Sequence, residues 1–125
     1  MTEVMEKRRV AVKCLRELEG LERAAQSLRV QVRPWNLPED PVARKALRKA
    51  YRDAARQVNV TRRALEILTP EERLIAYRLF ILPARGNVGL LCQELGVEQS
   101  SVYRKRDKML QKVGEAIGQC TMHNA

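Results

Sequence analysis

The chain has 125 residues, of which 45% are hydrophobic and 31% charged, and its formal net charge at pH 7 is +9. This length suits one domain, or a small domain with a helical appendage, and is enough to bury a core. Because the sequence has neither an apolar signal region nor an apolar run of the roughly 18 residues that a membrane span needs, we expect a cytoplasmic protein with no membrane partner.

The excess of Lys and Arg indicates an anionic partner, because phosphates attract clustered cations. Aromatic residues make up only 4% of the chain, and the apolar content is mostly Leu, Val and Ala, which favours an all-α fold. The cysteines Cys14, Cys92 and Cys120 are far apart and odd in number, so we expect reduced thiols, with Cys92 buried, and neither a disulfide framework nor a metal site.

The first predicted helix extends from Thr2 to about Val32. Its apolar and small residues recur mostly at intervals of three and four, which gives one apolar stripe: Val4, Ala11, Leu15, Leu18, Ala25, Leu28 and Val32. Gly20 lies in the middle at a cost of about 1 kcal/mol relative to alanine, so the sequence permits a bend or a break there. The three prolines of residues 33–41 end the helix.

A second helix is predicted from Pro41, with Asp40 as its N-cap, to Leu68. Its small and apolar residues form a seam typical of a coiled coil: Ala43, Leu47, Ala50, Ala54, Val58, Thr61, Leu65 and Leu68. At about 1.5 Å per residue both helices would be roughly 40 Å long, so they could pair along their whole length. Residues 1–68 are therefore predicted to form an antiparallel helical hairpin, which could also mediate homo-oligomer formation.

The sequence from Thr69 to Glu72 predicts the start of a third helix. Thr69 suits the N-cap, Pro70 the first helical position and Glu72 the capping box. These roles, and the favourable placement of acids at a helix N-terminus, explain Glu71 and Glu72 better than a catalytic carboxylate pair does. The helix is expected to continue to about Pro83, followed by a loop.

Two further helices are predicted between Asn87 and about Ile117, joined by a tight turn. Val88, Leu91, Cys92 and Leu95 share one face of the first, and Gly96 follows where a positive φ is needed. Apolar residues then resume with helical spacing: Val97, Val102, Met109 and Val113. This pattern is typical of a helix-turn-helix, whose second helix lies in the DNA major groove. We expect a DNA-binding domain over residues 69–118 and a flexible tail over 119–125.

Polar side chains cluster where such a helix contacts DNA, and they are the predicted DNA-binding residues: Gln99, Ser100, Ser101, Tyr103, Arg104, Lys105 and Lys108. Glutamine can bond an adenine edge and arginine a guanine edge. Arg85, Asn87 and Lys112 are further candidates for phosphate contacts. Residues 1–68 carry a net charge of +7 and residues 69–125 one of +2. In the basic half, Arg44, Arg48, Arg52 and Arg56 form one row, either a phosphate-contacting ridge or a solvated face neutralised by carboxylates of the first helix.

The segments 69–73, 91–97 and 100–110 together resemble region 4 of the sigma-70 family, which binds promoter −35 elements. The Val102-Tyr103-Arg104 sequence is similar to that of the ArpU and RinA type of late transcription activators of phages and integrated elements in Firmicutes. The resemblance covers residues 69 to about 117. It implies promoter DNA as ligand, RNA polymerase as a partner and no cofactor. Arg106 stands where region 4 commonly has an apolar residue, and we expect it to bond Glu94 or Glu98.

These patterns predict a sequence-specific DNA-binding transcription regulator. The alternative is a protein-interaction module that binds RNA polymerase or another partner through the hairpin. An enzyme is not expected, because the sequence has no phosphate loop, no metal-ligand spacing and no nucleophile with a paired base.

Overall fold

The computed structural model describes residues 2–83 and 87–123, and of residues 121–123 the backbone alone. It contains α1 (Glu3–Gln31), α2 (Pro41–Glu66), α3 (Pro70–Ala76), the π-helical turn η1 (Tyr77–Ile81), α4 (Asn87–Leu95) and α5 (Gln99–His123). The described part of the chain has no strand, which confirms the all-α prediction. None of the helices in these ranges is both long enough and apolar enough to cross a membrane.

The helix starts follow from capping side chains near the predicted positions. Thr2 accepts a hydrogen bond from the Met5 N–H at 3.2 Å, and Asp40 accepts one from the Val42 N–H at 3.3 Å. At α3 the predicted capping box is confirmed: Thr69 Oγ1 accepts from the Glu72 N–H, and the Glu72 carboxylate accepts from the Thr69 N–H. These bonds satisfy N–H groups that would otherwise lack partners at a helix start.

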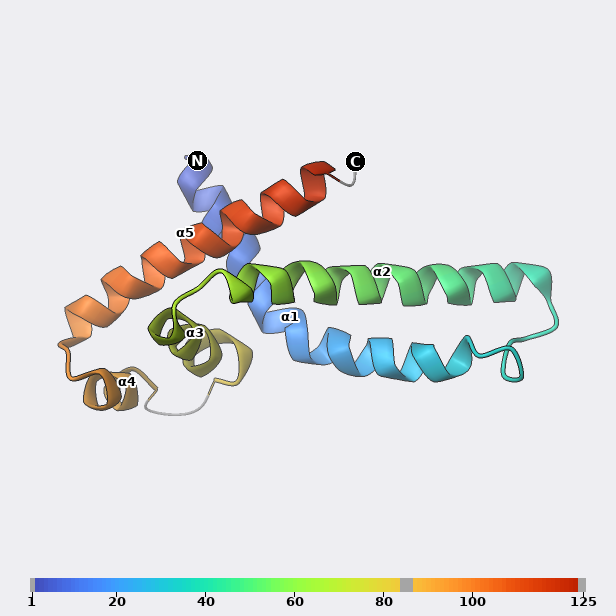
Figure 1. Ribbon diagram of the computed structural model, residues 1–125, viewed down its shortest axis with the longest axis horizontal. Helices are drawn as coiled ribbons and strands as arrows, with labels where there is room; N and C mark the ends of the chain where they lie inside the picture. Colours follow the sequence, from blue (N-terminus) through green and yellow to red (C-terminus); the bar gives the residue numbers. More distant parts are fainter. Residues whose placement is uncertain (1, 84–86, 124–125) are drawn as a thin grey trace.

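The helices are arranged along one long axis (Figure 1). α1 and α2 run in opposite directions and are joined by residues 32–40 at one end, whereas α3 and α4 lie toward the other end. α5 crosses the first half of α1. α1 bends in its middle but does not break, so its hydrogen-bonded helix passes through Gly20.

One hydrophobic core joins all the helices. Its fully buried side chains include Leu15 and Leu18 of α1, Ile75 of α3, Leu91 of α4 and Met109 of α5. The cluster continues through residues of α2 and η1. Side chains from both sides of the predicted boundary at residues 68 and 69 thus pack in one core, and the division into separate domains stays a prediction.

The apolar seam of α2 is buried over only part of its predicted length. Thr61, Leu65 and Leu68 are buried, but Ala43 and Ala50 are exposed. We call residues 21–53, which form the end of the α1 and α2 pair, the arm; no residue within it is buried. The buried part of the predicted seam therefore lies outside the arm. α5 packs on α1 and α2 outside it, and two helices alone cannot enclose a side chain.

The predicted end of α5 near Ile117 is also wrong, because the helix continues to His123. Gly114 is buried in that helix, and a Cβ atom there would lie 2.3 Å from the backbone carbonyl oxygen of Lys7. This glycine lets α5 approach α1 closely, and Ile117, one turn later, is buried. Packing on α1 thus outweighs the weak helix propensity of Gly114 and Gly118.

Replacing each glycine of α5 by alanine should separate packing from helix propensity. Apart from its immediate neighbours in the helix, no described atom would lie within 4 Å of a Cβ atom at Gly118. Gly118→Ala should therefore stabilise the protein by about 0.5 kcal/mol through helix propensity alone. Gly114→Ala should destabilise it by about 1–3 kcal/mol, because the Lys7 backbone cannot move away cheaply. Urea unfolding followed by circular dichroism measures both. Equal stabilisation by the two variants would contradict the close approach of α1 and α5.

Candidate nucleic-acid interface

Contacts between η1 and α4 fix the position of the shorter helix before α5. Arg78 pairs with Glu94 at 2.8 Å, and the amide of Asn87 donates a hydrogen bond to the backbone carbonyl of Arg78. α4 ends at Gly96, whose φ of 66° confirms the predicted positive value. A tight turn therefore separates α4 from α5.

Asn87 is not placed to contact a phosphate through its side chain. It is only 7% exposed, and its amide nitrogen is already bonded to Arg78. The prediction of a side-chain phosphate contact is wrong at this position, because the residue anchors the start of α4 in the interior. Arg85, the neighbouring candidate, lies outside the described residues.

α5 begins after Glu98, whose backbone carbonyl accepts hydrogen bonds from the N–H groups of Ser101 and Val102. Val102 is completely buried and anchors the first turn of the helix in the core. The predicted DNA-binding residues around it then divide between two faces of α5.

The outward face carries hydrogen-bonding groups in two pairs. Gln99 donates to the Tyr103 hydroxyl at 3.0 Å, and Arg104 donates to the Ser101 hydroxyl at 3.2 Å. Gln99, Ser100, Arg104 and Lys108 are exposed. A shallow hollow in this surface is lined by Ser101, Arg104, Lys105 and Lys108. The outward face therefore offers both neutral and cationic donors to a ligand.

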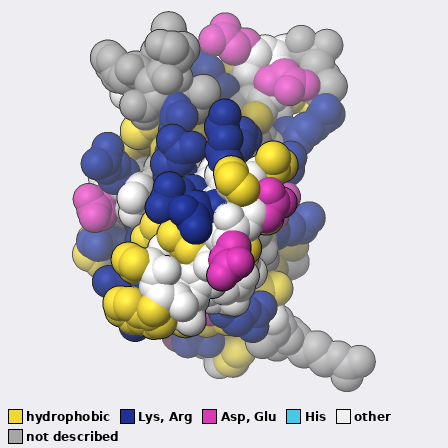
Figure 2. Space-filling model, turned by 90° about the vertical axis from the view of Figure 1, so that its right-hand side faces the viewer, with side chains coloured by type: hydrophobic (Ala, Val, Ile, Leu, Met, Phe, Trp, Pro, Cys, Tyr) yellow, Lys and Arg dark blue, Asp and Glu magenta, His cyan; other side chains and the backbone are white. Residues whose placement is uncertain are grey.

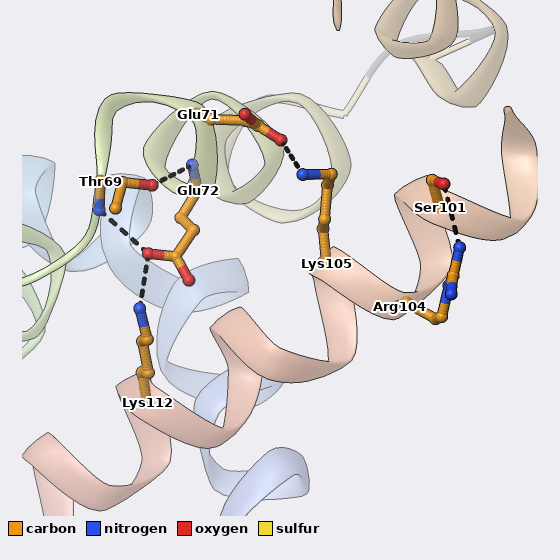
Figure 3. Close-up of polar contacts among 7 residues, drawn as sticks. All are labelled: Thr69, Glu71, Glu72, Ser101, Arg104, Lys105 and Lys112. Carbon is orange, nitrogen blue, oxygen red and sulfur yellow. Dashed lines mark hydrogen bonds and ion pairs between the residues drawn. The ribbon is translucent and has the colours of Figure 1, made fainter. Parts of the chain in front are cut away.

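The inward face is held by carboxylates at the start of α3 (Figure 3). Lys105 pairs with Glu71 at 2.5 Å, and Lys112 pairs with Glu72 at 2.9 Å. The two lysines are seven residues apart, so they project from the same side of α5. Both were predicted to contact DNA, but in this structure their ammonium groups are occupied by α3. Of the three lysines of α5, Lys105, Lys108 and Lys112, only Lys108 has no partner in the described residues.

Glu72 belongs to both the capping box and the ion pair, and its side chain is 10% exposed. Burial by itself would raise the pKa of this carboxyl group, but hydrogen bonds from Thr69 and the Lys112 ammonium lower the pKa below its usual range. The ionised form is therefore more stable in the folded protein than in the unfolded chain, and it contributes stability at neutral pH.

Glu72→Gln should destabilise the protein by about 1 kcal/mol at pH 7, because the ionised acceptor is lost. The contribution of Glu72 is complete above its unfolded pKa of about 4.3 and disappears as the pH falls through its lower folded value. The variant should thus approach the stability of the original protein in acid.

Glu71→Gln is the matched control, because its side chain is 41% exposed and its ion pair should contribute less than about 0.5 kcal/mol. Denaturant midpoints measured across the acidic range test both variants. Equal losses at neutral pH would contradict a special role for Glu72.

The sequence predicted that Arg106 would bond Glu94 or Glu98, but the structure shows neither pair. The Arg106 guanidinium bonds Asp107 at 2.9 Å and lies 4.9 Å from the centre of the Tyr103 ring. Glu94 is bound to Arg78 instead. The arginine is therefore accommodated at the side of α5 by stacking and a neighbouring carboxylate.

The arginine row of α2 lies partly in the arm. Arg44 donates from Nε to the Pro38 carbonyl at 3.1 Å, whereas Arg48 and Arg52 have no partner among the described residues. α1 has no carboxylate after Glu22, and Glu22 is bound to Arg62. Neutralising carboxylates of the first helix are therefore absent beside Arg48 and Arg52. Arg56 lies outside the arm and is exposed.

Comparisons with protein-family models, with curated proteins and with solved structures found no match.

The cysteines do not form a site in the described part of the chain. Cys14 is the buried thiol, and burial raises its pKa, whereas Cys92 is only half-buried, contrary to the prediction. The side chains described hold no group of three or more His, Cys, Asp and Glu residues that could bind a metal ion.

Sequence reasoning missed two features. It gave Glu71 a role only at its own helix end, because nothing in the sequence relates it to Lys105, 34 positions away. It also gave no role to Trp35, which is 75% exposed. Three neighbouring prolines identified that segment as a turn. The only sign of an exposed interaction residue was a large aromatic side chain in that turn.

Proposed function

We propose that the protein is a sequence-specific DNA-binding transcription regulator. In this proposal α1 and α2 are a helical hairpin, and α3 to α5 are a sigma region 4-like helix-turn-helix whose α5 enters the major groove. The supporting observation is the outward face of α5, which begins after a tight turn and is anchored by the buried Val102. Gln99, Arg104 and Lys108 are exposed on this part of the helix.

The geometry of α5 suits base contacts near its start. Its first turn is anchored by Val102, and Met109, Val113 and Ile117 are buried in its second half. The exposed cations of the helix, Arg104 and Lys108, therefore lie near its start. A major groove admits an α-helix whose N-terminal residues contact base edges. Arg104, held by Ser101, is the candidate for a guanine contact, and Gln99 for an adenine contact.

The ion pairs with α3 divide the cations of α5 into two groups. Arg104 and Lys108 are offered to DNA, whereas Lys105 and Lys112 must first leave Glu71 and Glu72. Carboxylates beside a DNA-binding surface also repel phosphates, so Glu71 would oppose binding that depends on charge alone. RNA polymerase as partner follows from the resemblance to the sigma family and is part of the proposal, not of the geometry.

Duplex binding should be steeply salt-dependent and should weaken about 10- to 100-fold in Arg104→Ala, because a bidentate base contact contributes about 1–3 kcal/mol. Lys105→Ala is the matched control: it removes a neighbouring cation already paired with Glu71, so it should have a smaller effect. Fluorescence anisotropy with a selected duplex measures both. Undiminished binding by Arg104→Ala would refute the base contact.

Selection of bound duplexes from a random pool provides that duplex and tests specificity directly. Enrichment of one sequence supports the proposal, and a repeated half-site would identify a dimer. Absence of enrichment would favour the second candidate, a protein-interaction module. The specific observation that supports this candidate is the uncovered arm.

A further inference from the structure

The end of the arm carries an open groove that joins basic and apolar side chains. The groove has a volume of about 670 Å³, and its lining residues come mostly from one side of α2: Val32, Pro41, Arg44, Lys45, Arg48, Tyr51 and Arg52. Trp35 and Val42, at the same end of the arm, are 75% and 76% exposed. Figure 2 shows Lys and Arg side chains gathered on this face with hydrophobic side chains beside them.

The cations of the groove lack intramolecular counterions. Lys45, Arg48 and Arg52 have no ion pair or hydrogen bond within the described residues. Of the four acids in the arm, Glu22 and Asp53 are paired with Arg62 and Lys49, and Asp40 caps α2. The fourth, Glu39, forms no ion pair with the described residues. The arm contains eight Lys and Arg against four Asp and Glu, a net charge of +4.

We propose that this groove binds an acidic amphipathic helix of a partner protein. Glutamate or aspartate along one side of that helix would pair with Lys45, Arg48 and Arg52, which recur at helical spacing. Its apolar side would cover Val32 and Tyr51 and reach toward Trp35. Helix-in-groove recognition uses such a row of apolar anchors, and aromatic and arginine side chains are enriched where protein interfaces contribute most binding energy.

Charge and composition favour this occupant over two others. A second arm would bring together two surfaces of net charge +4, which repel each other. DNA would pair with the cations but would leave the apolar side chains without a suitable contact, because protein–DNA interfaces are polar and strongly positive. The arm end also lies at the opposite end of the long axis from the start of α5 (Figure 1), so this inference is independent of the proposed DNA contact.

The test uses the full chain and a labelled synthetic helical peptide with leucine along one side and glutamate along the other. Binding is measured by anisotropy of the label and by emission of Trp35, the only tryptophan in the chain. We expect saturable binding with a blue shift of the Trp35 emission. Arg48→Glu should weaken binding by about tenfold or more through the reversed charge.

Two matched controls make the outcome decisive. Lys13→Glu reverses an exposed cation of α1 outside the arm, so it should leave peptide binding within about twofold. A peptide with its leucines replaced by serine should bind much more weakly. Equal effects of Arg48→Glu and Lys13→Glu, undiminished binding of the serine peptide or an unchanged Trp35 emission would each overturn the proposal. It would also be overturned if random duplex DNA, but not the leucine peptide, shifted the Trp35 emission.

Discussion

The structure depends on the close packing of α5 across α1 and α2. Gly114 brings the α5 backbone against Lys7, and Met109, Val113 and Ile117 of the same helix are buried in the common core. Interiors pack at nearly crystalline density, so a change of one methyl group at such a crossing is felt by both helices. The C-terminal half of α5 thereby becomes part of the core, and Val102 anchors the first turn of the same helix there as well. A helix anchored this way can present side chains to a ligand without first becoming ordered, which lowers the entropic cost of binding.

Electrostatic contacts then determine what α5 presents. The first turn of α3 places two carboxylates opposite α5, those of Glu71 and of the capping-box residue Glu72, and each binds a lysine there. The same residues thus stabilise a helix start and remove cations from the candidate DNA surface. Since Glu72 is buried, its pair with Lys112 contributes mainly to the stability of the fold. Glu71 is exposed, so its pair with Lys105 mainly changes the charge of the surface.

The arm is the opposite case, because no residue within it is buried. The apolar stripe of α1 and the seam of α2 continue into the arm, but their buried residues lie outside it, between Ala11 and Leu18 and between Ala54 and Leu68. The uncovered apolar side chains lie beside unpaired cations, and together they form a surface of mixed character. Large exposed apolar surfaces edged by polar groups are typical of interaction sites. The arm therefore presents apolar side chains beside cations, whereas the start of α5 presents polar and cationic groups.

The sequence by itself determined the helices and their starts. The apolar periodicity predicted the long helices. Asp40 and Thr69 marked helix starts and Gly96 marked a turn, because capping and positive φ depend on residues that are neighbours in the chain. Only the tertiary structure decided which parts of those helices are buried. The predicted helix end near Ile117 is overridden by the packing of Gly114 against α1. The predicted phosphate contact of Asn87 is replaced by its bond to Arg78, and the predicted DNA contact of Lys105 competes with its ion pair to Glu71. Each of these outcomes depends on residues distant in the chain, and helical periodicity carries no information about which distant helix will cover a face.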